Sequence, residues 1–137
     1  TWLRSLAKWG ARHGRPLEAR WVRFDRSGRA YVPNPAQARA VFALRYDPDL
    51  SARMAAELAR ENATVMAGAL SRPVGPRELY AAHLLGLQGA LRLIRAAEAT
   101  PDLPAADLLP EAAASNARLF YEGDQPRSAA TLLALFS

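Results

Sequence analysis

The sequence of 137 residues is half hydrophobic and 23% charged, which is the composition of a single folded globular domain. It has no cysteine and two histidines, so disulfides, thiolate chemistry and cysteine-bound zinc are excluded, and we expect neither a metal nor a cofactor. No run of 18 apolar residues occurs, and we expect no membrane span.

The net charge of +5 is concentrated near the start of the chain. Residues 1–30 hold eight basic side chains against two acidic ones, whereas the other 107 residues hold ten basic and eleven acidic ones. A basic segment of this kind suits an anionic polymer such as nucleic acid or cell wall. The alternative interpretation is an arginine-rich composition with a solvated basic face.

Alanine and leucine dominate, while Val, Ile and Thr are sparse, so we expect an all-α fold of about seven helices. Apolar residues at helical spacing over residues 2–9 predict a first helix that ends at Gly10 or Gly14. Residues 15–34 are the least helical part of the chain. Two short extended pieces around a Ser-Gly turn indicate a small irregular or hairpin segment near residues 22–33.

Two Asx-Pro pairs predict helix starts, because Asn or Asp caps a helix and proline fits its first position. Asn34-Pro35 begins a helix that is expected to run to about Tyr46. Asp47-Pro48 begins the longest one, to about Leu70. The apolar side chains of this longest helix are spaced for one buried stripe: Leu50, Met54, Leu58, Val65 and Met66.

Proline and glycine divide the rest of the chain. A turn at 71–76 precedes a helix that begins at Pro76 and that Gly86 and Gly89 interrupt. The remaining segments are expected in this order: a helix over 90–99, a loop with one helical turn over 101–110, a helix over 111–119, a loop over 123–126, and a helix from the Ser128 cap to Phe136.

The most informative segment is Gly75 to Ala90, where a helix carries polar groups on one face and then breaks at glycines. Tyr80 and His83 are three residues apart and therefore share a helix face. The glycines would let backbone approach a ligand closely. A purely structural interpretation stays open, in which Tyr80 and His83 are satisfied core residues and the glycines permit tight helix packing.

This segment resembles the "ELYLAHFLGAGGA" stretch of alphaproteobacterial proteins that have a soluble-lytic-transglycosylase-type domain. The resemblance covers most of the chain, because further motifs of the family follow in the same order. They are "TWL" at residues 1–3, "LRxDPxxSAxMAA" at 44–56, "(D/E)N" at 61–62, "FPxAAxxNxxxFY" at 109–121 and "RS" at 127–128.

The resemblance implies one lysozyme-like helical domain over residues 1–137 that lacks its amino-terminal catalytic segment. Members of the family cleave the β-1,4 bond between N-acetylmuramic acid and N-acetylglucosamine without water and leave 1,6-anhydro-muramoyl ends. Their single glutamate acts as general acid and then base. Its "ES" motif and the following "GLFQF" motif would both precede Thr1, so we expect residues 1–137 alone to be inactive.

A periplasmic location and peptidoglycan glycan strands as the partner follow from the same resemblance, together with envelope or flagellar assembly proteins. Nucleic acid is not an expected partner. In more distant relatives "AYNAG" takes the place of the helix-then-glycine stretch, so that His83 would face the catalytic carboxyl and residues 86–90 would line the sugar cleft. The expected substrate-binding residues are Tyr80, His83, Gly86, Gln88, Gly89, Asn116 and Tyr121.

Two features of this chain depart from the simplest form of that expectation. The family's "GAGGA" is Gly86-Leu87-Gln88-Gly89-Ala90 here, and the larger Leu87 and Gln88 side chains leave open whether the cleft is narrowed. Tyr121 could equally belong to the core, with its hydroxyl at the surface.

No carboxylate within the sequence is expected to act as the acid. Glu78 is expected to complement the dipole of a first helical turn, and Glu57 to form surface ion pairs with Arg53 and Arg60. The alternative function is a non-catalytic helical interaction or nucleic-acid-binding module that uses the basic residues 1–30. This alternative lacks a helix-turn-helix signature.

Overall fold

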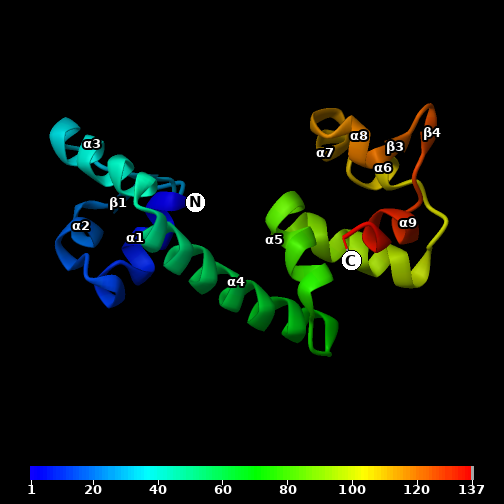
Figure 1. The fold of residues 1–137 in the computed structure, drawn as a ribbon, viewed down its shortest axis with the longest axis horizontal. Coiled ribbons are helices and arrows are strands. Elements are labelled where there is room, and N and C mark those ends of the chain that lie inside the picture. Colours follow the sequence, from blue (N-terminus) through cyan, green and yellow to red (C-terminus); the bar gives the residue numbers. More distant parts are fainter. Residues whose placement is uncertain (137) are drawn as a thin grey trace. The chain divides into compact units, whose positions relative to one another are not determined.

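The computed structural model describes residues 1–136, and about 71% of these residues are helical (Figure 1). The described residues form nine α-helices, two short 3-10 helices and two small antiparallel hairpins, so the predicted all-α class is confirmed. None of the described helices is long and apolar enough to cross a membrane. Two compact units divide the chain, unit 1 at Thr1–Glu61 and unit 2 at Asn62–Ser137. That both units belong to one lysozyme-like domain stays a prediction.

Unit 1 is helical except for one hairpin. The hairpin between β1 and β2 confirms the expected segment near residues 22–33: Gly28 has φ +84°, and the Asp25 carboxylate accepts the backbone N–H groups of Ser27 and Arg29, both at 2.9 Å. The short α2 was not expected. Pro16 at its first position and Glu18 in its first turn favour it locally. The elements are α1 Trp2–Trp9, η1 Ala11–His13, α2 Pro16–Trp21, β1 Arg23–Phe24, β2 Ala30–Tyr31, α3 Pro35–Ala43, η2 Leu44–Tyr46 and α4 Pro48–Leu70.

Both Asx-Pro helix starts are confirmed. The Asn34 side chain accepts the backbone N–H of Gln37 at 3.0 Å, and the Asp47 carboxylate accepts those of Asp49 and Leu50 at 3.0 and 3.2 Å. These bonds satisfy N–H groups that have no partner within the helix itself.

The predicted apolar stripe of α4 is right except at Val65. Leu50, Met54 and Met66 are buried and Leu58 is partly buried, whereas 43% of Val65 is exposed. Successive residues of a helix point about 100° apart, and here Met66 faces the core while Val65 points away from it.

The core of unit 1 is built around α1. It contains the buried side chains Leu6, Trp9, Val22, Val41, Leu50 and Met54. Trp2 and Trp21 pack against this cluster, and the Trp2 indole donates to the Val41 carbonyl at 3.0 Å. All three tryptophans therefore serve the core of unit 1.

Unit 2 consists of one long bent helix and several short elements. Residues 111–119 were expected as one helix but form two, because Asn116 leaves the helical region with φ −135° and ψ 51°. The expected loop at 123–126 is the tip and second strand of a hairpin that turns at Gly123, φ +62°. The short α2, the helical turn α6 Ala105–Leu108 and the division of residues 111–119 bring the described helices to nine, although the two helices expected over 76–99 form one bent helix. The elements are α5 Pro76–Ala99, α6 Ala105–Leu108, α7 Pro110–Ser115, α8 Ala117–Phe120, β3 Tyr121–Glu122, β4 Gln125–Pro126 and α9 Ala129–Ala134.

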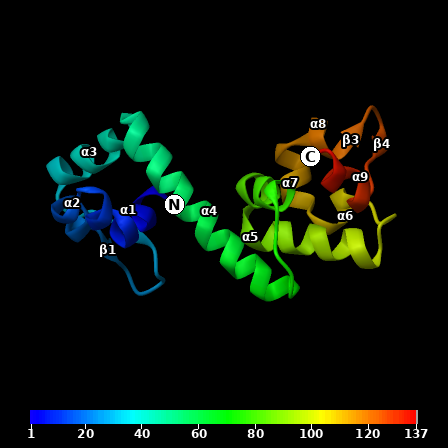
Figure 2. The same ribbon diagram turned by 60° about the horizontal axis from the view of Figure 1, so that its bottom comes forward.

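The core of unit 2 lies where α9 packs against α5, as Figures 1 and 2 both show. Its largest fully buried side chains are Phe120, Met66, Leu93, Ile94 and Leu132. Ser128 caps α9 as predicted, since its hydroxyl accepts the Thr131 backbone N–H at 3.1 Å. This packing fixes the second segment of α5 in the core and leaves one face of its first segment exposed.

Candidate functional site

The helix break in α5 lies at Gly86. This residue has φ +75° and ψ 164°, a region that is essentially restricted to glycine, and Figure 2 shows α5 changing direction there. Gly89 was also expected to interrupt the helix, but Gly86 is the one residue of α5 with non-helical backbone angles. A Cβ at Gly89 would lie 3.2 Å from the Leu85 Cβ, so this glycine is needed for close packing instead.

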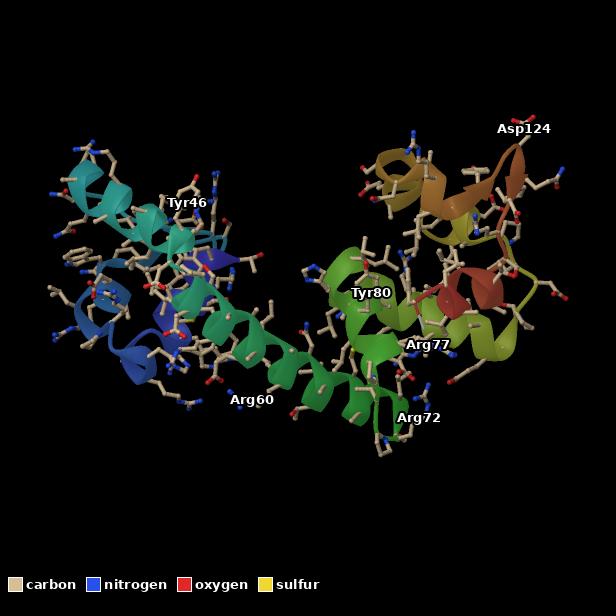
Figure 3. The ribbon with its side chains drawn as sticks, in the orientation of Figure 1. Tyr46, Arg60, Arg72, Arg77, Tyr80 and Asp124 are labelled. Atoms are coloured by element: carbon tan, nitrogen blue, oxygen red, sulfur yellow. The ribbon has the colours of Figure 1, made fainter. Side chains whose placement is uncertain are left out.

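Tyr80 and His83 lie on one exposed face of the segment before the bend, as their spacing predicts. Their ring centroids are 6.3 Å apart, and the Tyr80 ring also meets the edge of Phe136 at 5.5 Å. Half of Tyr80 is exposed, and Figure 3 shows it on the same segment as Arg77. No hydrogen bond or ion pair within residues 1–136 engages the polar atoms of either ring. The interpretation of this pair as satisfied core residues is therefore wrong.

The bend itself is open to solvent. Gly86 is exposed, and nothing within residues 1–136 lies within 4 Å of the position that a Cβ would take there. Gln88 is also exposed, whereas Leu87 is partly buried against the core of unit 2. Backbone at Gly86 can therefore be approached closely by a ligand.

Asn116 and Tyr121 make their observed contacts with other parts of unit 2. The Asn116 side-chain amide donates to the Ala112 carbonyl at 3.1 Å, and Tyr121 is partly buried against the core of unit 2. Within the described part of the chain, no hydrogen bond or ring contact joins either residue to Tyr80 or His83. The contacts of these two side chains could not be predicted from the resemblance, because they depend on how the elements of unit 2 pack.

Glu57 was expected to form ion pairs at the surface, but it is buried, with 5% of the residue exposed. Both of its oxygens accept from Arg12 at 3.2 Å, and one of them also meets His13 at 3.1 Å and Arg60 at 3.0 Å. Arg53 pairs with Asp49 instead of Glu57. The spacing held a signal for this, since residue 57 lies on the apolar stripe of α4 three residues after Met54.

Burial raises the pKa of Glu57, but hydrogen bonds from His13 and Arg12 and the charge of Arg60 outweigh it and hold the pKa below its ordinary value. A general acid needs the opposite shift, since it must keep its proton near neutral pH. Glu57 is thus an ionised structural group that ties residues 12–13 to α4.

Glu78 has the role at a helix start that its position predicts. Its carboxylate accepts the Gly75 backbone N–H at 3.0 Å and pairs with Arg72 at 3.0 Å, and Arg72 also reaches Glu98 at 2.9 Å. Burial raises the pKa of Glu78, but backbone hydrogen bonds and the Arg72 guanidinium leave it below its ordinary value. Glu78 is therefore no better suited than Glu57 to protonate a glycosidic oxygen.

Unit 1 carries surface hollows that sequence reasoning missed. One hollow of about 440 Å³ is here called the arginine hollow. It is lined by Thr1, Trp2, Leu3, Arg4, Arg29, Ala30, Phe42 and Arg45. A second of about 530 Å³, the Trp9 hollow, is lined by Arg4, Lys8, Trp9, Leu58 and Glu61 among others. The excess of arginine over residues 1–30 was visible in the sequence, but the convergence of residues 4, 29 and 45 was not.

The described residues hold no group of three or more His, Asp or Glu side chains that could bind a metal ion. Two exposed surfaces are the candidates for binding: the Tyr80–His83 face beside the Gly86 bend in unit 2, and the arginine hollow in unit 1. The sequence matches no model of a known protein family.

Proposed function

We propose that residues 1–137 belong to a peptidoglycan lytic transglycosylase with a lysozyme-like fold. The enzyme would cleave the β-1,4 bond between N-acetylmuramic acid and N-acetylglucosamine without water and leave 1,6-anhydro ends. The observation that carries the proposal is the exposed bend at Gly86 next to the rings of Tyr80 and His83, whose polar atoms have no hydrogen-bond partner within residues 1–136. It lies in the segment whose motif most resembles that family.

The chemistry of this face suits an aminosugar strand. An exposed aromatic ring such as Tyr80 can stack on the apolar face of a sugar, and the free imidazole nitrogens of His83 can bond to hydroxyl or acetamido groups. At Gly86 the missing side chain exposes backbone N–H and carbonyl groups to the same ligand. The exposed Gln88 adds an amide on the far side of the bend.

The general acid of the proposed reaction is a glutamate outside residues 1–137, on a segment before Thr1. Glu57 and Glu78 are held in their ionised form, Glu57 by Arg12 and Arg60 and Glu78 by Arg72. A periplasmic location and a role beside envelope or flagellar assembly proteins belong to the same proposal.

Digestion of purified peptidoglycan tests it. We expect 1,6-anhydro-muropeptides, identified by mass spectrometry, from the natural chain extended before Thr1 and none from residues 1–137 alone. Replacing the upstream glutamate by Gln should abolish the product. Tyr46→Ala is the control variant and should leave the product unchanged, because it removes an exposed aromatic ring of unit 1 that lies outside the proposed site (Figure 3). Activity of residues 1–137 alone would show that the acid lies within them, and reducing ends in place of anhydro ends would indicate a hydrolase.

A nucleic-acid-binding module remains the second candidate, and one observation favours it. Residues 1–61 hold twelve basic and six acidic side chains, whereas residues 62–137 hold six and seven, so the excess of positive charge belongs to unit 1. Salt separates the candidates, because DNA binding through many phosphates falls steeply with salt concentration. Muropeptide affinity that survives salt would favour the transglycosylase.

A further inference from the structure

The arginine hollow gathers three guanidinium groups from distant parts of unit 1. Arg4 comes from α1, Arg29 precedes β2, and Arg45 lies in η2. Its lining includes the apolar side chains of Trp2, Leu3 and Phe42 but no acidic residue. Three positive groups around about 440 Å³ with no carboxylate among them form a site for an anion.

Two of these guanidinium groups are held in place by contacts that leave donors unused. One Nη of Arg4 donates to the Gly28 carbonyl, and its guanidinium carbon lies 5.5 Å from the centroid of the Phe24 ring. Arg45 donates through Nε to the Phe42 carbonyl at 3.2 Å and lies 4.9 Å from the centroid of the Phe42 ring. Both Nη groups of Arg45 therefore remain available, and two such donors match the two oxygens of a carboxylate.

The positive region is confined, because carboxylates stand on both sides of it. Asp25 lines an adjoining hollow of about 540 Å³ that shares Arg29 and Phe42 with the arginine hollow. Glu61, paired with Lys8, lines the Trp9 hollow, which shares Arg4. A nucleic-acid strand needs a continuous basic groove along its phosphates. A short peptide with separate carboxylates needs a few arginines in one place, which is what the surface offers.

We propose that the arginine hollow binds the carboxylates of an acidic peptide, and that these are the free carboxylates of the peptide stems of peptidoglycan. The second half of this statement rests on the proposed function. In a stem-bearing unit of that polymer the lactyl carboxyl of N-acetylmuramic acid is amide-bonded to the stem and N-acetylglucosamine is uncharged, so the free carboxylates of the unit lie on its peptide. Arg29 and Arg45 would bind them, while Phe42 and Trp2 pack against the aliphatic part of the stem.

Titration calorimetry with defined probes tests the proposal. The probes are a disaccharide muropeptide with its peptide stem, the same compound with its carboxylates converted to amides, the peptide-free disaccharide with its lactyl carboxyl as an amide, and a short oligothymidylate. Arg29→Gln and Arg45→Gln each remove one guanidinium. Arg39→Gln is the matched control. Arg39 is exposed on α3, and its substitution removes the same charge outside the hollow. Thermal denaturation of each variant checks that it folds.

We expect the intact muropeptide to bind, and each hollow variant to weaken it about ten-fold or more, the range for a lost charged hydrogen bond. Arg39→Gln should change the affinity less than about two-fold. Equal binding of the intact and the amidated compound, or no binding of either, would overturn the hollow as a carboxylate site. Preferential binding of oligothymidylate that Arg29→Gln weakens would replace the peptide by nucleic acid.

The two proposals fail in distinguishable ways. If the hollow does not bind peptide but the enzyme is a transglycosylase, 1,6-anhydro products still form, and Arg45→Gln does not change their yield. If the hollow binds acidic peptides but the enzyme is not a transglycosylase, the calorimetric difference between intact and amidated muropeptide persists while anhydro products are absent.

Discussion

Gly86→Ala is the substitution that most directly tests the bend in α5. With φ of +75° and ψ of 164°, the backbone at this position has a conformation that residues with a side chain rarely adopt. Apart from the nearby backbone of α5 and the two chain neighbours of Gly86, no atom of the described residues lies within 4 Å of the added Cβ, so the substitution meets no side chain from elsewhere. Its whole effect comes from the backbone.

The magnitude follows from two opposing terms. Strain in this region costs about 1–3 kcal/mol, and the smaller conformational freedom of alanine in the unfolded chain returns about 0.4–1 kcal/mol. We therefore expect Gly86→Ala to lower the free energy of unfolding by about 1–2 kcal/mol. Gly68→Ala is the matched control in the same unit, because Gly68 is helical with equally open surroundings. It should instead add about 0.5 kcal/mol.

Urea denaturation followed by far-ultraviolet circular dichroism measures both variants. Hydrogen exchange read by mass spectrometry then shows whether the loss in Gly86→Ala is centred on residues 76–99. Because the two substitutions add the same methyl group, their opposite signs cannot come from hydrophobicity. If Gly86→Ala is as stable as the wild type, or shifts in the same direction as Gly68→Ala, position 86 does not have the positive φ and the argument for the bend is lost.

Three further outcomes are expected. Glu57→Gln lowers the free energy of unfolding at neutral pH. Because the pKa of Glu57 is lowered in the folded state, the difference in this free energy between wild type and variant shrinks as the pH falls below 4.5. Urea titrations at several pH values measure it, with Glu111→Gln as the control. Asn34→Ala removes the cap of α3 and costs about 1 kcal/mol, whereas Asn34→Asp keeps an acceptor and costs little; thermal denaturation compares them. His83→Ala in the extended enzyme should lower the yield of anhydro-muropeptides about ten-fold or more and change stability by less than about 0.5 kcal/mol, since His83 is exposed. Unchanged yield would remove His83 from the site.

The helix starts were predictable because caps are local. Asn34, Asp47 and Ser128 each satisfy N–H groups two or three residues away, and the prolines after Asn34 and Asp47 fit the first helical turn, so nothing distant in the chain is needed to read them. The break at Gly86 was also predictable from the sequence. The difference between Gly86 and Gly89 was not, because the two glycines look alike in the sequence and differ only in what packs beside them.

The candidate site was predictable in part for the same reason. Tyr80 and His83 share a face because three residues make nearly one helical turn, and that holds wherever the helix lies. Asn116 and Tyr121 were expected in the same site through the resemblance, and their observed contacts are with Ala112 and with the core of unit 2. Sequence spacing carries no information on such contacts across elements.

By itself, the sequence determined the helical class, the capped starts of α3, α4 and α9, and the shared face of Tyr80 and His83 on the first segment of α5, whose exposure only the structure decided. Tertiary structure alone decided that Glu57 is buried between Arg12 and Arg60, and that arginines 4, 29 and 45 converge on one hollow. The physical reason is range: capping and helical periodicity act within about four residues. Burial and the meeting of charges depend on which distant segments the apolar cores bring together.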